Sequence, residues 1–241
     1  MRNYEKEFSE RVRFIRETVA QADSDGVVFG NSGGKDSALV GILAKAACKK
    51  TIGVIMPCTS RRNYEEDASD AAQLAQQYEI ETRTIDLSPV KNAELEALQK
   101  NVQLSAAAVA NIAPRLRMTT LYAIAASENC LVAGTGNRSE AYVGYFTKWG
   151  DGAYDFNPIS DLTVTEVYEF LRFLDAPKRI LDKAPSAALF DGQTDEKEMG
   201  VSYATLDSFI LGGNVDLDAQ RQIERMHKRS LHKLESPKRF A

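Results

Sequence analysis

The stretch Gly26-Val27-Val28-Phe29-Gly30-Asn31-Ser32-Gly33-Gly34-Lys35-Asp36-Ser37 decides the fold. Residues 26–30 form an apolar run that predicts a short buried strand, and residues 37–48 predict an apolar helix. Glycines between a strand and a helix let the backbone adopt positive φ and approach a bound group closely. The amides of such a turn and the N-terminal end of the next helix attract anions. We therefore expect a phosphate-binding loop formed by Gly30, Asn31, Ser32, Gly33, Gly34, Lys35, Asp36 and Ser37.

Asp36 is the unusual member of this loop, because a carboxylate repels a phosphate group. It fits the site if it holds a Mg²⁺ ion that bridges to the phosphates. The loop is not a Walker A motif, since Gly34-Lys35 is followed by an acid rather than by Ser or Thr, and no GxGxxG fingerprint is present. The plainer interpretation is a glycine-rich turn that is capped by Asp36 or Ser37.

Strands and helices alternate along the rest of the chain. Further strands are expected at residues 51–56, 81–85 and 130–133, and helices at residues 1–20, 63–78, 89–100, 118–127, 163–174, 203–211 and 218–229. This alternation predicts an α/β protein with a doubly wound parallel sheet flanked by helices. Ligands bind beyond the carboxyl ends of the strands in such folds. Without a repeat or a low-complexity linker, residues 1–241 are expected to form a single domain.

Composition excludes several classes of protein. Thirty Lys and Arg against thirty-four Asp and Glu give a net charge of −4, which argues against a nucleic-acid partner. Cys48, Cys58 and Cys130 show no paired spacing, which indicates a reducing compartment, and His227 and His232 are too few for a three-histidine metal site. No apolar stretch reaches the roughly 20 residues that span a bilayer. We therefore expect a cytoplasmic protein without a membrane partner.

The phosphate loop resembles that of the N-type ATP pyrophosphatases, which include NAD, GMP, argininosuccinate, asparagine and tRNA-lysidine synthetases. A second block selects among them: Gly134-Thr-Gly-Asn-Arg-Ser-Glu140, then Gly144-Tyr-Phe-Thr-Lys-Trp-Gly-Asp-Gly152, then Asp155 before Pro158. Lys183-Ala-Pro-Ser186, Gly192-Gln-Thr-Asp-Glu196 and His232-Lys233 follow in the same order. Together these motifs resemble the NAD synthetase family over about residues 25–240. The resemblance implies the adenine nucleotide alpha hydrolase-like form of the fold.

The resemblance also implies a reaction. Ammonia would amidate deamido-NAD (nicotinic acid adenine dinucleotide) to NAD through an adenylated carboxylate, with ATP converted to AMP and pyrophosphate. Glutamine-dependent members carry an additional amidase domain, for which 241 residues leave no room, so the ammonia-dependent type is expected. Mg²⁺ would be the cofactor and ATP the co-substrate. A homodimer is implied as well, with residues 102–121 as a candidate interface or as ordinary core.

Site residues are carried over onto the matching motifs. ATP would be bound by the loop Gly30 to Ser37, by Thr135 and by the hydroxyl of Ser186, while Asp36 and Glu140 would hold Mg²⁺. Deamido-NAD would be bound by Arg115, Lys148, Asp155, His232 and Lys233. The catalytic roles would fall to Asp36, Lys148 and Ser186. The plainer interpretations are a helix cap for Asp36, a solvated carboxylate for Glu140, a turn serine for Ser186 and a solvated basic surface for the cations.

Two positions depart from the family pattern. Val164 stands where the family usually has a lysine, so one phosphate contact is missing or is supplied elsewhere, with Lys35 as a candidate. Ser186-Ala187-Ala188-Leu189 lacks the acid of the family's Thr-Ala-Asp-Leu. Two alternatives stay open. The chain is another ATP pyrophosphatase, such as a GMP synthetase or a tRNA-modifying subunit, or it is a non-catalytic nucleotide-binding module, which the valine supports.

Overall fold

A four-stranded parallel sheet forms the centre of the computed structural model, which describes residues 2–58, 63–183 and 194–240. The sheet order is β3-β2-β1-β4, with β1 (Gly26–Gly30), β2 (Lys50–Ile55), β3 (Glu81–Thr84) and β4 (Cys130–Ala133). Val28 of β1 pairs with Ile52 on one side and with Val132 on the other. Almost every residue of the inner strands β1 and β2 is buried, because helices cover both faces of the sheet. The predicted parallel sheet is confirmed.

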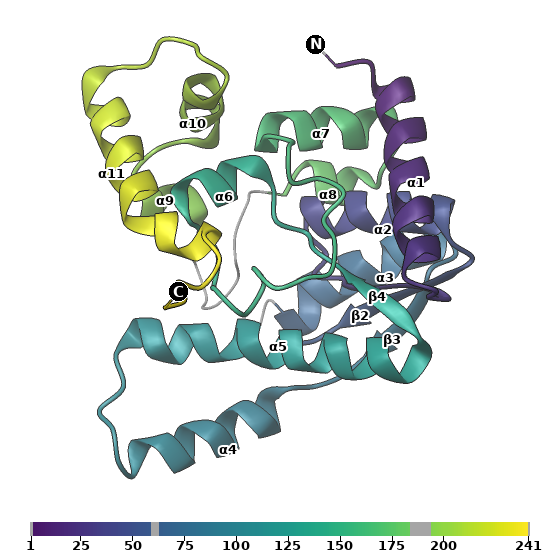
Figure 1. Cartoon of the computed structure of the whole chain (residues 1–241), viewed down its shortest axis with the longest axis horizontal. Coiled ribbons are helices and arrows are strands. Elements are labelled where there is room, and N and C mark those ends of the chain that lie inside the picture. The colour runs from purple at the N-terminus through teal and green to yellow at the C-terminus, as the bar shows by residue number, and fades with distance from the viewer. Residues whose placement is uncertain (1, 59–62, 184–193, 241) are drawn as a thin grey trace.

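Helices cover the sheet in two layers (Figure 1). On one face, Val27 and Phe29 share a core with Leu39, Leu43 and Phe170. That layer contains α1 (Tyr4–Gln21), α2 (Lys35–Ala47), α3 (Ala68–Gln77), α7 (Val164–Phe173) and α8 (Lys178–Leu181). The opposite face packs against α5 (Ala106–Glu128), with α4 (Ser88–Gln99) outside it.

A separate cluster of helices closes the end of the sheet where the strands finish. It consists of α6 (Arg138–Val143), α9 (Asp195–Met199), α10 (Tyr203–Ile210) and α11 (Leu217–Leu234), which gather at one side of the view in Figure 1. These helices share a smaller core that includes Val143, Leu206 and Ile223, and Val164 at the start of α7 packs into it. Val164 is therefore an apolar core residue here, and its side chain is 3% exposed.

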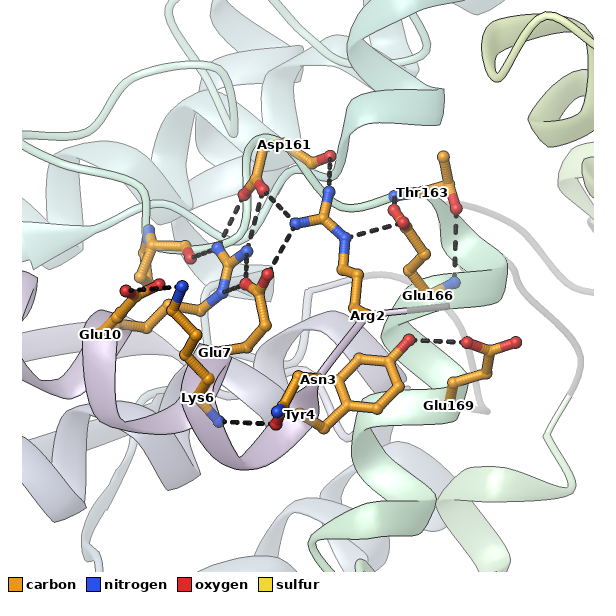
Figure 2. A network of polar contacts seen from close by, with 12 residues as sticks. Arg2, Asn3, Tyr4, Lys6, Glu7, Glu10, Asp161, Thr163, Glu166 and Glu169 are labelled. Atoms are coloured by element: carbon orange, nitrogen blue, oxygen red, sulfur yellow. Dashed lines mark hydrogen bonds and ion pairs between the residues drawn. The ribbon is translucent and has the colours of Figure 1, made fainter.

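An ion-pair network fastens the N-terminal helix to the start of α7 (Figure 2). Arg2 Nε donates to Glu166 at 2.7 Å, and Arg11 donates to Asp161 at 2.7 Å. The Tyr4 hydroxyl donates to Glu169 at 2.6 Å. The apolar spacing predicts a helix at the N-terminus, and this network shows what its polar face contacts. The network thus ties the N-terminal helix to the residues that lead into α7.

The main correction to the predicted elements concerns the helix expected at residues 118–127. Helix α5 begins at Ala106, with Ser105 as its N-cap, and Pro114 lies in its interior. A proline inside a helical pattern usually signals a helix end, because it removes an amide donor. The short helices α6, α8 and α9 also lie outside the predicted elements, since four to six residues carry too little periodicity. None of the described helices combines the length and apolarity needed to cross a bilayer.

Candidate active site

A cavity of about 520 Å³ lies at the carboxyl ends of β1, β2 and β4. Its walls come from the loop after β1, the end of β2, one stripe of α5 and residues 133–136 after β4. The chain leaves β1 toward β2 on one side, and β4 returns on the other side, so the strand order reverses at this point. Open α/β sheets bind ligands at such switch points. The cavity lies where the sequence places the chemistry, and its size suits a nucleotide.

The phosphate loop is held by its own hydrogen bonds. Ser32 Oγ and Ser37 Oγ lie 3.1 Å apart, and the Gly34 amide donates to Ser32 Oγ at 3.3 Å. Asn31 is buried, and its Nδ2 donates to the carbonyl of Ala71 at 3.0 Å, which ties the loop to α3. Gly34 is the N-cap of α2 and has no side chain to satisfy the first amides of that helix. The positive end of α2 is thus directed at the cavity.

Gly33 is the one residue of the phosphate loop that does not line the cavity. Its φ is +71°, and a Cβ at this position would lie 2.2 Å from the carbonyl oxygen of Asp67. The other predicted loop residues, Gly30, Asn31, Ser32, Gly34, Lys35, Asp36 and Ser37, line the cavity together with Thr135 and Glu140. Ser186 lies outside the described residues. The structure therefore brings the predicted ATP-binding residues that it describes to one place.

Asp36 and Glu140 come from different parts of the chain and meet through Asn137. Asn137 Nδ2 donates to Asp36 Oδ1 at 3.0 Å, and the Asn137 amide donates to Glu140 Oε2 at 3.2 Å. Asn137 is fully buried and is the N-cap of α6, where it forms a capping box with Glu140. Lys35 Nζ lies 2.6 Å from Asp36 Oδ2 and 3.9 Å from Glu140 Oε1. Two carboxylates and one ammonium thus form a compact cluster against the cavity.

This cluster perturbs the protonation of its members. Burial raises the pKa of Glu140, and the charge of Asp36 raises it further, against the opposing effect of Lys35. Burial alone would lower the pKa of Lys35, but the charges of Asp36 and Glu140 outweigh it and raise that pKa. Lys35 is therefore charged at neutral pH. Perturbed groups of this kind in a cavity are typical of functional sites.

The acidic pair fits Mg²⁺. Oxygen ligands suit this ion, which in nucleotide sites takes one or two carboxylates together with substrate phosphates. Over residues 2–58, 63–183 and 194–240, no group of three or more His, Cys, Asp and Glu side chains could hold a metal ion by itself. An ion at Asp36 and Glu140 would therefore need further ligands from a substrate.

Four of the five residues predicted to bind deamido-NAD do not line this cavity. Arg115 is exposed and donates to the carbonyl of Lys148. The Lys148 ammonium contacts the carbonyl of His232 and lies 5.4 Å from the centroid of the Trp149 ring. The Asp155 carboxylate accepts from the Val132 amide at 2.7 Å and from the Tyr122 hydroxyl, so it fixes the end of β4. The structure therefore places Arg115, Lys148, Asp155 and His232 outside the cavity that the phosphate loop lines, and their role in binding deamido-NAD stays a prediction.

Lys233 is the member of that group that does line the cavity. Its Nζ donates to the carbonyls of Gly144 and Phe146 at 2.7 Å each. It lies near the end of α11 and holds the loop that follows α6. The neighbouring pair His227-Lys228 plays another part, because His227 stacks on Tyr142 at 4.2 Å and contacts the Tyr142 carbonyl. Of these two pairs, Lys233 alone lines the cavity.

Arg117 is the cavity cation that the sequence interpretation missed. Its Nε donates to the carbonyl of Met56 at 3.1 Å, and burial lowers its pKa. The residues of α5 that line the cavity follow helical spacing: Ala107, Ala110, Asn111, Pro114, Arg117, Met118 and Leu121. Arg115 is two positions from Arg117 and therefore lies on another side of the helix. The periodicity of α5, had its start at residue 106 been recognised, would have selected Arg117.

A second ionic cluster anchors the chain on the far side of the cavity. Lys183 Nζ lies 2.6 Å from Asp67 Oδ1 and 2.7 Å from Asp70 Oδ2. Arg179 Nε adds a contact to Asp70 at 3.0 Å. Lys183 and Asp67 line the cavity, and so does Asp195, which accepts from the Tyr203 hydroxyl. The sequence motifs contain Lys183 and Asp195, but nothing in the sequence pairs the lysine with α3.

Glu140→Gln is expected to stabilise the nucleotide-free protein at pH 8. Because the folded-state pKa of Glu140 is raised, the native protein binds more protons than the unfolded chain once the pH passes the ordinary glutamate range. Wild-type stability should then fall with rising pH, and the amide removes this penalty while it can still complete the capping box. We expect a gain of about 1 kcal/mol or more at pH 8 that fades toward pH 5, measured by urea unfolding.

The matched control for that measurement is Glu96→Gln, because Glu96 lies on α4 with a side chain that is 76% exposed. This variant should track wild type at both pH values. A loss of stability for Glu140→Gln at pH 8, or a gain that does not depend on pH, would contradict the stated cause.

Comparison with known proteins identifies the family. The family model for NAD synthase matches residues 7–237, which is nearly the whole chain. The chain belongs to the NAD synthase family. This membership decides between the two enzyme interpretations in favour of NAD synthase over another ATP pyrophosphatase. It also agrees with the cavity, because the matched region contains every described residue that lines it.

Relatives cover the NAD synthase chain almost end to end. An NH3-dependent NAD+ synthetase from Carboxydothermus hydrogenoformans is 44% identical, over 98% of this chain and 97% of its own. The structure of an NMN synthetase from Francisella tularensis has a TM-score of 0.94 and 40% identity, and it covers 99% of both chains. An NH3-dependent NAD synthetase from Campylobacter jejuni has a TM-score of 0.82 and 29% identity over 100% of both chains. The expected adenine nucleotide alpha hydrolase-like fold is confirmed.

Proposed function

We propose that this NAD synthase family member catalyses the ATP-dependent amidation of deamido-NAD by ammonia, giving NAD, AMP and pyrophosphate. One observation carries the proposal: the loop after β1 and the carboxylates Asp36 and Glu140 converge on one cavity at the switch point of the sheet. A polyphosphate needs anion-binding amides and a cation site within reach of each other, and this arrangement supplies both. The relatives named as NAD+ synthetases support the choice of acid substrate.

The chain's own residues would act mainly by positioning and by neutralising charge. The nicotinate carboxylate must attack the α-phosphorus of ATP, so an anion approaches a polyanion and repulsion dominates the barrier. The amides of the loop and of α2, with Ser32, Ser37 and Thr135, would bind the phosphates. Asp36 and Glu140 would hold Mg²⁺, which neutralises phosphate charge when it is bound. Pyrophosphate leaves as the carboxylate bonds to the α-phosphorus; ammonia then attacks the adenylated carboxyl carbon, and AMP and a proton leave.

The nicotinate end of the substrate needs cations that remain charged while partly buried. Arg117 and Lys233 line the cavity on the side of α5 and the loop after α6, and both cations lie against backbone carbonyls. We place the substrate carboxylate on this side, opposite the amides of the phosphate loop. Ser186 stays a proposed ATP contact. Arg115, Lys148, Asp155 and His232 would contribute only to a part of the dinucleotide that lies outside the cavity.

Nicotinate mononucleotide is a second candidate substrate. The observation that favours it is the likeness to the Francisella NMN synthetase, with a TM-score of 0.94 against 0.82 for the Campylobacter NAD synthetase. The mononucleotide has the same carboxylate and lacks the adenylate half of deamido-NAD. Four residues predicted to bind deamido-NAD lie outside the cavity: Arg115, Lys148, Asp155 and His232. This placement agrees with a substrate that does not need them.

A parallel assay tests the proposal and separates the two substrates. Purified protein is supplied with ATP, Mg²⁺, ammonium chloride and either acid, and amide product and AMP are quantified by liquid chromatography. We expect equal amounts of amide and AMP with ammonium, and kcat/KM higher for deamido-NAD. A higher kcat/KM for the mononucleotide would transfer the proposal to that substrate. No amide from either acid would instead support the non-catalytic nucleotide-binding module.

Assembly and location are further parts of the proposal. We propose a homodimer, with residues 102–121 as the contact region, because Val102 at the start of this stretch is 52% exposed. Sedimentation at several protein concentrations would test it. We propose one domain and a cytoplasmic location, which is supported by the three free cysteines Cys48, Cys58 and Cys130.

A further inference from the structure

Lys35 occupies an unusual position for a lysine. It lies in the first turn of α2, its side chain is 6% exposed, and its ammonium is directed into the acidic pair rather than into solvent. The Nζ atom lies 2.6 Å from Asp36 Oδ2, 3.9 Å from Glu140 Oε1 and 5.7 Å from the centroid of the Tyr203 ring. Burying a lysine is costly unless the charge is paired, and here both of its acidic partners are candidate metal ligands.

The oxygen atoms of the two carboxylates are divided between two roles. Asp36 Oδ1 and Glu140 Oε2 accept hydrogen bonds from Asn137, which fixes both side chains. The remaining oxygens, Asp36 Oδ2 and Glu140 Oε1, face the Lys35 ammonium. These are the oxygens with which the pair would bind a divalent ion. An ammonium at this position and a divalent ion on the same two oxygens would repel each other strongly.

We infer that the Lys35 ammonium is a resident counter-cation of the Asp36–Glu140 pair, which keeps a divalent ion out until a polyphosphate binds. Without nucleotide, the ammonium lies against both carboxylates and offsets part of the repulsion between them. When phosphates enter the cavity, the flexible lysine stem lets the ammonium turn from Asp36 to a phosphate oxygen, because Lys35 and the phosphate loop line the same space. Metal and nucleotide binding would then be cooperative.

Val164 is consistent with this role. It lies in the apolar cluster with Tyr203 and Tyr168 beside the Lys35 ammonium, so α7 supplies no cation from this position. Lys35 is thus the cation that reaches the acidic pair from the loop itself. The inference rests on the proposed function only for the identity of the polyphosphate, since the position of the ammonium is independent of the acid substrate.

Metal binding to the nucleotide-free protein tests the inference. Mn²⁺ serves as the probe, and free Mn²⁺ is measured by electron paramagnetic resonance during titration of wild type and Lys35→Gln. Removing the positive charge that lies 2.6 Å from Asp36 Oδ2 should tighten Mn²⁺ binding by roughly tenfold or more. Equal or weaker Mn²⁺ binding by the variant would overturn the inference. Lys35→Met, which keeps an apolar stem of similar length, should behave like Lys35→Gln.

Two controls localise the effect. Lys45→Gln removes the same charge from the same helix, and because Lys45 is away from the acidic pair it should leave Mn²⁺ affinity within about twofold of wild type. Glu140→Gln combined with Lys35→Gln should abolish the gain, since the pair is then incomplete. A gain that persists in this double variant would place the metal elsewhere and contradict the inference. Circular dichroism and thermal unfolding confirm that each variant is folded.

A nucleotide arm tests the second half of the inference. The α,β-methylene analogue of ATP is titrated calorimetrically in saturating Mn²⁺, where it cannot be cleaved at the reacting phosphorus. We expect Lys35→Gln to bind this analogue roughly fivefold or more weakly than wild type, because a phosphate contact is lost. Unchanged affinity would overturn the transfer of the ammonium to phosphate. Product formation is not used in either arm, so these results stand apart from the amidation assay.

Discussion

Asp36→Asn is expected to lower the rate of ATP-dependent amidation by a factor of about 10³. The asparagine keeps the oxygen that accepts from Asn137, so the local hydrogen bond remains, but it removes the charge shared by Lys35 and the proposed metal. Repulsion between the substrate carboxylate and the phosphates would then be incompletely neutralised. Initial rates of AMP and amide formation at saturating ATP and Mg²⁺ measure the loss.

Asp218→Asn is the matched control, because Asp218 also lies in the first turn of a helix and its side chain is 96% exposed. It should leave the rate unchanged. An Asp36→Asn enzyme that works within a few-fold of wild type would show that the carboxylate has no catalytic role and that the plain interpretation of a helix-start acid is right.

Gly33→Ala is expected to be the most damaging single change in the phosphate loop for both stability and nucleotide binding. The new Cβ would lie 2.2 Å from the carbonyl oxygen of Asp67, which is backbone and cannot rotate aside, and the residue would keep φ near +71°. Left-handed backbone alone costs about 1–2 kcal/mol, and the clash adds to it, so we expect a loss of roughly 3 kcal/mol. Urea unfolding and calorimetric titration with ATP measure the two effects.

Gly200→Ala separates the two causes. Gly200 has φ +69°, and the nearest atom to a Cβ there lies 4.0 Å away, so this variant bears the backbone cost without the clash. It should lose only about 1 kcal/mol. If both variants lost the same stability, contact between the loop and α3 would not be what requires glycine at position 33.

The phosphate loop is the part of the site that sequence reasoning predicts best. The residues Gly30 to Ser37 are neighbours in the chain, between a strand and a helix. Their glycines, hydroxyls and acid therefore reach a ligand together, and their arrangement follows from this adjacency. The pairing of Asp36 with Glu140 depends on the sheet order, which places the loop after β4 beside the loop after β1. The alternation of strands and helices in the sequence also predicts that these two loops lie at the same edge of the sheet.

Side chains on long helices and loops are where sequence reasoning fails. Arg115 and Arg117 are both plausible anion contacts, and only the phase of α5 decides that Arg117 lines the cavity. The motif predicts that Asp155 binds the substrate, and the fold adds a hydrogen bond from the Val132 amide to its carboxylate that no motif records. The ion pairs of Lys183 join residues more than a hundred positions apart. Such contacts follow from the packed fold rather than from spacing.

Transfer of oxygen from the substrate carboxylate to AMP tests the central claim most directly. Deamido-NAD labelled with ¹⁸O in both oxygens of the nicotinate carboxylate is converted with ATP, Mg²⁺ and ammonium, and the products are analysed by mass spectrometry. Attack of the carboxylate on the α-phosphorus predicts one ¹⁸O in each AMP and one in each amide. Unlabelled AMP, or label in inorganic phosphate with ADP as the co-product, would contradict adenylation at this site.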